Sequence, residues 1–90
     1  MIHQIRVGDQ LSYGCVDRVI NIHWGTSNGP FCTTGLEYEC LFRANGKWFK
    51  RDECDGQNGG CITAVLPSVT DDTVDAYAKE CEASWKKISR

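Results

Sequence analysis

The chain has 90 residues, a formal net charge of −2 and 41% hydrophobic residues, which is the size of one domain with one modest core. This composition excludes a disordered chain, which would combine low hydrophobicity with high net charge. The slight negative charge argues against binding driven by a large positive field. Six cysteines are the unusual feature of so short a chain.

The cysteines predict mostly buried free thiols, with disulfides or a metal site as alternatives. No C-x-x-C or C-x-x-H occurs, so the closely spaced ligand pairs of zinc sites are missing. The start of the chain has no secretory signal pattern, and no run approaches the roughly 20 apolar residues of a membrane span. We therefore expect a cytoplasmic protein with no membrane contact, no metal and no cofactor, in which reduced thiols pack as small hydrophobes.

The first half of the chain is expected to form two strands, over residues 5–13 and 16–24, and then a loop over 25–30. A turn at Val7-Gly8-Asp9 interrupts the first strand. Alternation in the second strand places two sets of side chains on opposite sides: Ile20, Ile22 and Trp24 on one, and Val19, Asn21 and His23 on the other.

Residues 36–53 predict a β-hairpin, because Asn45-Gly46 is the preferred pair for a two-residue type I′ turn. The turn sets a register in which Phe42 faces Phe49 and Arg43 faces Trp48. One face is then a core face with Leu36, Tyr38, Cys40, Phe42 and Phe49. The other is mostly polar, with Glu37, Glu39, Leu41, Arg43, Trp48 and Lys50.

The last third of the chain predicts a loop over 55–60, a short apolar strand over 61–66 and a helix over 70–89. Thr70 is a plausible N-cap, and acids at the start and bases at the end match the helix dipole. Apolar residues with a 3.6-residue period form a stripe: Val74, Tyr77, Ala78, Cys81, Trp85 and Ile88. We expect this stripe to pack on the sheet; a partner groove or homodimer face is the alternative.

The order of Val7-Gly8-Asp9, Leu11-Ser-Tyr-Gly14, Tyr38-Glu-Cys-Leu-Phe42 and Asn45-Gly46-Lys47-Trp48-Phe49 resembles SH3-like small barrels of the Tudor or KOW type. It is similar in particular to short barrels encoded by phages and mobile elements. The resemblance covers residues 5–54. It implies a mostly β, α+β fold: a small antiparallel SH3-like barrel of about five strands within residues 1–66, with one C-terminal amphipathic helix, in a single domain over 1–90. It also implies a binding module rather than an enzyme.

One candidate binding surface is basic and aromatic. Its residues are Arg43, Lys47, Trp48, Lys50 and Arg51. Basic groups can contact phosphates while an aromatic ring stacks on a base, which makes weak nucleic-acid binding an alternative function. The competing interpretation is a solvated strand face with an Arg43–Trp48 cation–π pair.

A second candidate surface is acidic and lies on the helix. Its residues are Asp71, Asp72, Asp75, Glu80 and Glu82. Such a patch could meet the basic groove of a larger protein; the competing interpretation is that it complements the helix dipole and keeps the chain soluble.

Other kinds of site have weaker support. An aromatic cage for a methylated cation would use Tyr13, Trp24, Tyr38 and Trp48, but core packing is the expected place of Trp24 and Tyr38. A Cys–His pair arises by chance among six cysteines and two histidines. Paired carboxylates at Glu37, Glu39 and Asp52 have little room for a substrate cleft.

Taken together, these features predict a non-catalytic binding module that acts through protein–protein contact and has no catalytic residues. Its more specific form is an inhibitor of a host protein, encoded by a phage or mobile element. A homodimer is a further possible assembly.

Overall fold

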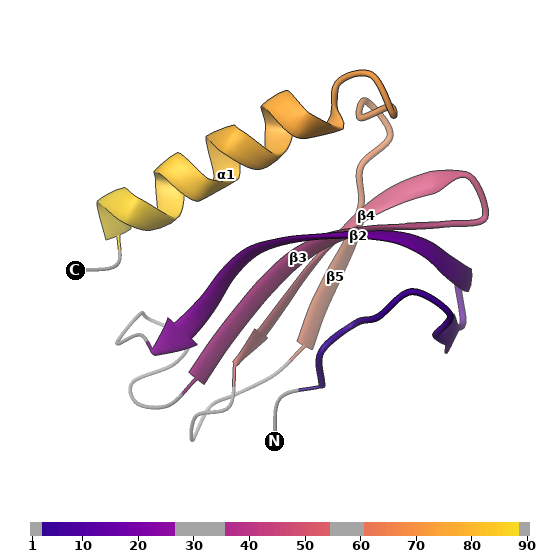
Figure 1. Ribbon diagram of the computed structural model, residues 1–90, viewed down its shortest axis with the longest axis horizontal. Coiled ribbons are helices and arrows are strands. Elements are labelled where there is room, and N and C mark those ends of the chain that lie inside the picture. Colours follow the sequence, from indigo (N-terminus) through magenta and orange to yellow (C-terminus); the bar gives the residue numbers. More distant parts are fainter. Residues whose placement is uncertain (1–2, 27–35, 55–60, 89–90) are drawn as a thin grey trace.

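The computed structural model describes residues 3–26, 36–54 and 61–88, which form a curled, antiparallel half-barrel with a C-terminal helix (Figure 1). The elements are β1 (Gln10–Leu11), β2 (Gly14–Thr26), β3 (Leu36–Ala44), β4 (Lys47–Cys54), β5 (Cys61–Val65) and α1 (Val74–Ile88). The spatial order of the strands follows the chain, so β1 and β5 are the two edges of the described sheet. The predicted mostly β fold with one C-terminal helix is confirmed.

The boundaries of the expected elements changed most near the N-terminus. Only Gln10 and Leu11 form a strand within the expected segment 5–13. Strand β2 is longer than expected and ends at Thr26, which is inside the expected loop over 25–30. The rest of that loop, the lead-in over 31–35 and the loop over 55–60 lie outside the described residues.

The central hairpin has the predicted turn and register. Asn45 and Gly46 have φ angles of 55° and 75°, as a type I′ turn requires at both central positions. Phe42 pairs with Phe49 and Arg43 with Trp48. The local sequence is therefore sufficient to set the alignment of β3 and β4.

Two register shifts in β2 overturn the predicted sidedness of its C-terminal end. They lie between Val16 and Arg18 and between Asn21 and His23. Because a bulge inserts a residue, the side chains after it change faces. His23 consequently faces α1 and stacks on Trp85, whereas Trp24 lies on the opposite side, is 52% exposed and meets Tyr38 edge-on.

We call the sheet face with Tyr38, Cys40, Phe42 and Phe49 the aromatic face. All four side chains are buried, together with Val16 and Ala44 from the same face and Ile5 from the N-terminal segment. The Phe42 and Phe49 rings stack at 5.1 Å between centroids. Ile5 caps this face, where its N–H donates to the Tyr38 hydroxyl at 3.2 Å. Here the predicted core face is confirmed.

We call the opposite side of the sheet, which α1 covers, the helix face. Leu41 and Trp48 are 0% and 2% exposed there, and Glu39 is 4% exposed. The predicted side chains do lie on this face and most of them are polar, but the interpretation of it as a solvated face was wrong, because α1 covers it. The apolar stripe of α1, from Val74 through Tyr77, Ala78 and Cys81 to Trp85, packs against this cluster, as predicted. The side chain of Ile88, the last residue of the predicted stripe, lies outside the described part.

The helix begins at a polar turn formed by Thr70 and Thr73. The Val74 N–H donates to the Thr70 carbonyl at 2.8 Å, and the Thr70 N–H donates to Thr73 Oγ1 at 2.9 Å. The second bond is half of a capping box, in which the side chain three residues into the helix returns to the cap. Thr70 is therefore the residue that caps α1.

The thiols divide between core and surface. Cys40 is buried on the aromatic face and Cys81 is partly buried in the α1 stripe, whereas Cys15 and Cys61 are exposed; all four are free. The prediction of mostly buried thiols therefore fails for Cys15, the second residue of β2, and for Cys61, the first residue of the edge strand β5. The side chains of Cys32 and Cys54 lie outside the described part.

Candidate functional site

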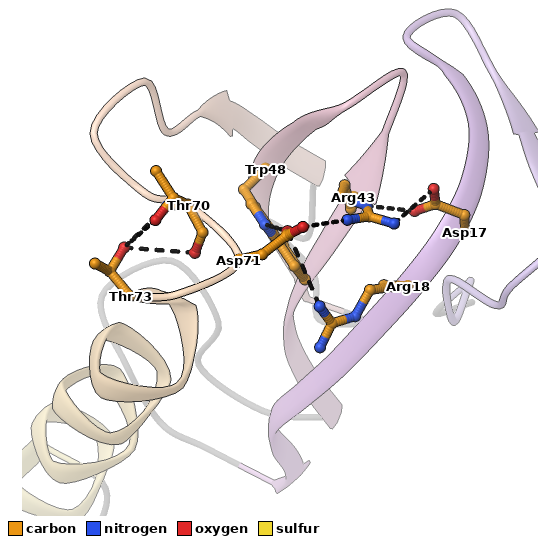
Figure 2. A network of polar contacts seen from close by, with 7 residues as sticks. All are labelled: Asp17, Arg18, Arg43, Trp48, Thr70, Asp71 and Thr73. Atoms are coloured by element: carbon orange, nitrogen blue, oxygen red, sulfur yellow. Dashed lines mark hydrogen bonds and ion pairs between the residues drawn. The ribbon is translucent and has the colours of Figure 1, made fainter.

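A polar network joins the start of α1 to the helix face, with Asp71 at its centre (Figure 2). Trp48 Nε1 donates to Asp71 Oδ1 at 2.8 Å. Arg43 Nη1 donates to the other oxygen, Oδ2, at 2.6 Å, while its Nε and Nη2 donate to Asp17 at 2.9 and 3.0 Å. Both oxygens of Asp71 are thus occupied by groups from the hairpin.

Arg18 completes this network from β2. Its guanidinium carbon lies 5.2 Å from the centroid of the Trp48 ring, and its Nη1 lies 3.9 Å from Asp71 Oδ1. The cation over Trp48 is therefore Arg18 and not the predicted Arg43, whose guanidinium is bound by Asp17 and Asp71.

Each charged group of the network stabilises the ionised form of its partner. The hydrogen bond from Trp48 and then that from Arg43 hold the pKa of Asp71 below its usual value. Hydrogen bonding by Arg43 likewise lowers the pKa of Asp17, and both carboxylates raise the pKa of Arg43. These groups stay ionised at neutral pH, so the network acts as a tie between helix and sheet.

The structure does not bring the predicted basic and aromatic residues into one exposed patch. Trp48 is buried, so its ring is not presented to a nucleic-acid base. Lys50 Nζ lies 3.3 Å from Glu39 Oε2, and Arg51 Nε lies 3.4 Å from Glu53 Oε2. With Arg43 also paired, only Lys47 of the candidate cations is exposed at the hairpin end with no ion pair found among the described residues.

The acidic helix candidates lie in two different settings. Asp71 belongs to the network just described. Asp72, Asp75, Glu80 and Glu82 are exposed on α1 and the turn before it. Four of the five acidic candidates are therefore exposed, whereas the fifth, Asp71, is engaged with the sheet.

Sequence reasoning missed a row of ionisable side chains under the C-terminal half of α1. His23, Glu39 and Asp52 are cross-strand neighbours on β2, β3 and β4. The Trp85 ring covers His23 at 4.0 Å between centroids. His23 Nε2, Glu39 Oε1 and Asp52 Oδ1 are buried and have no hydrogen-bond partner among the residues that the structure describes. The alternation of the hairpin placed Glu39 and Asp52 together, but only the docked helix reveals their burial.

Burial makes Glu39 a weaker acid than an exposed glutamate. Loss of solvent raises its pKa to about 7, the neighbouring Asp52 adds to the increase, and the Lys50 charge opposes it. A carboxyl group with this pKa exchanges its proton near neutral pH. Across the described segments, no grouping of three or more His, Cys, Asp or Glu side chains is arranged so that it could hold a metal ion.

An apolar groove of about 360 Å³ runs between the first half of α1 and the segment after β5. Its lining residues are Leu66, Pro67, Ser68, Val69, Thr73, Ala76, Tyr77 and Glu80. Leu66 directly follows β5, so the groove continues the line of that strand. An apolar floor with one acid at its rim suits a partner's side chain better than a polar substrate.

The strand β5 itself is an exposed edge. It pairs with β4 on one side, and no described strand lies on the other. None of its five residues is charged, and Ile62 and Val65 are 61% and 51% exposed. Natural sheet edges are usually protected by charges, prolines or bulges, and β5 has none within its bounds.

Among the described residues, no helix is long and apolar enough to cross a membrane. No family model, curated protein or solved structure matches this chain. The candidate site therefore rests on the geometry of the described residues, and the β5 edge with its adjoining groove is the candidate binding surface.

Proposed function

We propose that this protein is a non-catalytic binding module that takes up an extended segment of a partner protein along the free edge of β5. One observation carries the proposal: β5 is an uncharged strand whose outer edge has no partner among the described strands, and it carries two exposed branched aliphatic side chains. Addition of a partner strand to such an edge is a common mode of peptide recognition.

The backbone of β5 is arranged to receive a strand. The Leu66 N–H donates to the Trp48 carbonyl at 2.9 Å. Hydrogen-bonded and non-hydrogen-bonded pairs alternate along antiparallel strands, so Ala64 and Ile62 also direct their backbone groups at β4. Cys61, Thr63 and Val65 must then direct theirs outward, where a partner strand would lie.

Side chains around the edge would supply affinity beyond the backbone bonds. Ile62 and Ala64 lie on the helix face but are exposed, since the residues that pack with the α1 stripe come from β2, β3 and β4 and from the segment after β5. The groove from Leu66 to Tyr77 extends this apolar strip beyond the end of β5. A partner with alternating apolar residues fits this surface, because alternate side chains of a strand point to one face.

The resemblance to SH3-like small barrels is part of this proposal, since it too implies a binding module. Inhibition of a host protein is its more specific form, and identification of the bound partner would test it. Nucleic-acid binding has less support: Trp48 is buried, and three of the four hairpin cations are paired with acids.

A display library of random peptides tests the proposal. We expect wild-type protein to select apolar peptides that bind as strands, and Ile62→Lys to weaken that binding at least tenfold, because a lysine protects an edge. Val7→Lys is the matched control, since Val7 is 66% exposed and lies outside the sheet. A bound peptide should also slow hydrogen exchange at the Thr63 and Val65 amides.

The proposal fails if no peptide is selected, or if selected peptides bind wild type and Ile62→Lys equally well.

A further inference from the structure

We propose that a second copy of this chain can occupy the same edge, through an antiparallel β5–β5 pair with a two-fold axis at Thr63. The pair would join two five-stranded sheets into one continuous sheet. This inference rests on the proposed use of the β5 edge and names one occupant of it.

Backbone geometry favours this register. A two-fold axis through Thr63 pairs Thr63 with Thr63 of the second copy, and Cys61 with Val65. These are the three residues whose backbone groups point away from β4, as follows from the bond between the Leu66 N–H and the Trp48 carbonyl. Within β5, an axis through Ile62 or Ala64 would leave some of these groups unpaired, whereas the axis through Thr63 uses all of them.

The side chains of β5 are compatible with self-pairing. The strand sequence is Cys-Ile-Thr-Ala-Val, with no charged residue. Like charges placed opposite each other, which commonly prevent a strand from pairing with its own copy, are therefore absent, and a Thr–Thr pair at the centre is favourable. Pro67, two residues after the strand, lacks the N–H that a longer ladder would need.

The axis also determines what covers the exposed apolar side chains. The two-fold axis of an antiparallel pair is perpendicular to the sheet, so both α1 helices would lie on the same face. Ile62 and Ala64 of the two copies then form one apolar stripe between the helices. A groove lined by Leu66, Val69 and Tyr77 borders the stripe on each side. The 61% exposed Ile62 would lose much of its contact with water.

The interface is small, so the dimer should be weak. A five-residue strand pair with its stripe covers less than the roughly 800 Å² per partner of a standard interface. We expect a dissociation constant on the order of 10–100 µM. A partner strand would compete with the second copy for the same backbone groups.

Sedimentation equilibrium in the presence of a reductant, from about 10 µM to 1 mM, measures the association. Wild type should pass from monomer to dimer with rising concentration. Ile62→Lys should weaken the dimer at least tenfold, because it places a charge from each copy in the apolar stripe, and Val7→Lys should match wild type. Equal urea midpoints for the two variants would show that both are folded.

Crosslinking tests the register. In the proposed dimer, residue 65 of one copy lies opposite Cys61 of the other, and cross-strand Cα atoms at hydrogen-bonded positions are about 5.5 Å apart, within disulfide reach. Under mild oxidation, Val65→Cys should give a reducible covalent dimer joined to Cys61, as identified by peptide mass spectrometry. Val7→Cys should not give that linkage.

The outcomes separate this inference from the proposed function. A protein that stays monomeric throughout the range, yet still binds selected peptides at β5, overturns the second copy and keeps the binding module. A dimer insensitive to Ile62→Lys, or crosslinked elsewhere, also overturns the inference. A monomer that binds no peptide overturns both.

Discussion

The two faces of the sheet are both buried, but by different means. On the aromatic face, Tyr38 and Phe42 are 1% and 0% exposed and pack with other apolar groups. On the helix face, Leu41 and Trp48 are equally buried, but they share the face with a buried carboxyl, Glu39, and the Asp71 network. Apolar groups need only volume and shape, whereas buried charges need partners at defined positions. The aromatic face can thus form from local alternation, while the helix face exists only when α1 is docked.

The largest expected effect is on the aromatic face. Phe42→Ala should lower the free energy of unfolding by about 3–5 kcal/mol, because it opens a cavity beneath a stacked ring. Urea unfolding followed by tryptophan fluorescence measures the loss. Phe42→Leu, which keeps most of the volume, should cost clearly less. Equal costs for both substitutions would contradict the description of this face as tightly packed.

The helix face should instead show a pH-dependent stability. The pKa of Glu39 is about 7 in the folded protein, against 4.5 for a glutamate without these surroundings. The folded state therefore favours the protonated form. The contribution of Glu39 to the free energy of unfolding is then fully present below about pH 4.5 and is lost as the pH rises through 7. The loss should be at most about 3 kcal/mol, since a difference of one pKa unit between the two states corresponds to about 1.4 kcal/mol.

Urea midpoints across this range measure the decline, and Glu39→Gln should remove it. Glu80→Gln, a substitution of an exposed acid on α1, should leave it in place. The groups facing Glu39 are His23, Lys50 and Asp52 from the sheet, with Trp85 and Cys81 from the helix. A decline that persists in Glu39→Gln would assign the titration to another of these groups.

A smaller effect is expected at the tie between α1 and the sheet. Asp71→Asn removes the charge that pairs with Arg43 and weakens the contact with Trp48. It should lower the thermal midpoint more than Asp72→Asn, since only Asp71 contacts the sheet among these neighbouring acids in the described structure. High salt should reduce the difference, because the network is exposed. Equal midpoints for the two variants would show that the network contributes no stability.

Thiol reactivity gives the finest comparison of the two faces. Burial raises the pKa of Cys40 to about 11 and also raises the pKa of Cys81, which is only partly buried. Pulsed alkylation with mass spectrometry should label the exposed Cys15 and Cys61 first, Cys81 next and Cys40 last, because the thiolate reacts and must be accessible. Labelling of Cys40 before Cys81 would show that the aromatic face opens more readily than the helix face.

Local signals were enough wherever the structure depends on neighbours in the chain. Asn45-Gly46 predicts the turn and thereby the register of β3 and β4. The spacing from Val74 to Trp85 predicts the buried stripe of α1. The sides of the sheet on which Trp24 and His23 lie could not be predicted in this way. The bulge that moves each of them to the opposite face has no distinct signal in the sequence.

The candidate site shows the same division. The candidate binding residues chosen from the sequence include Arg43, Trp48 and Asp71, which the fold instead joins to one another by hydrogen bonds. The β5 edge was visible in the sequence only as a short apolar strand. The sheet order places β5 at the edge. The exposure of its side chains shows that α1 does not cover it.

The sequence by itself determined the elements and one of the two buried faces, since turns, caps and periodicity act between residues that are close in the chain. The tertiary structure decided which polar residues are buried, which cations are held in ion pairs, and which strands lie at the edges of the described sheet. Those properties depend on contacts between distant segments, above all where α1 lies on the sheet. Periodicity along one segment carries no information about where another segment docks.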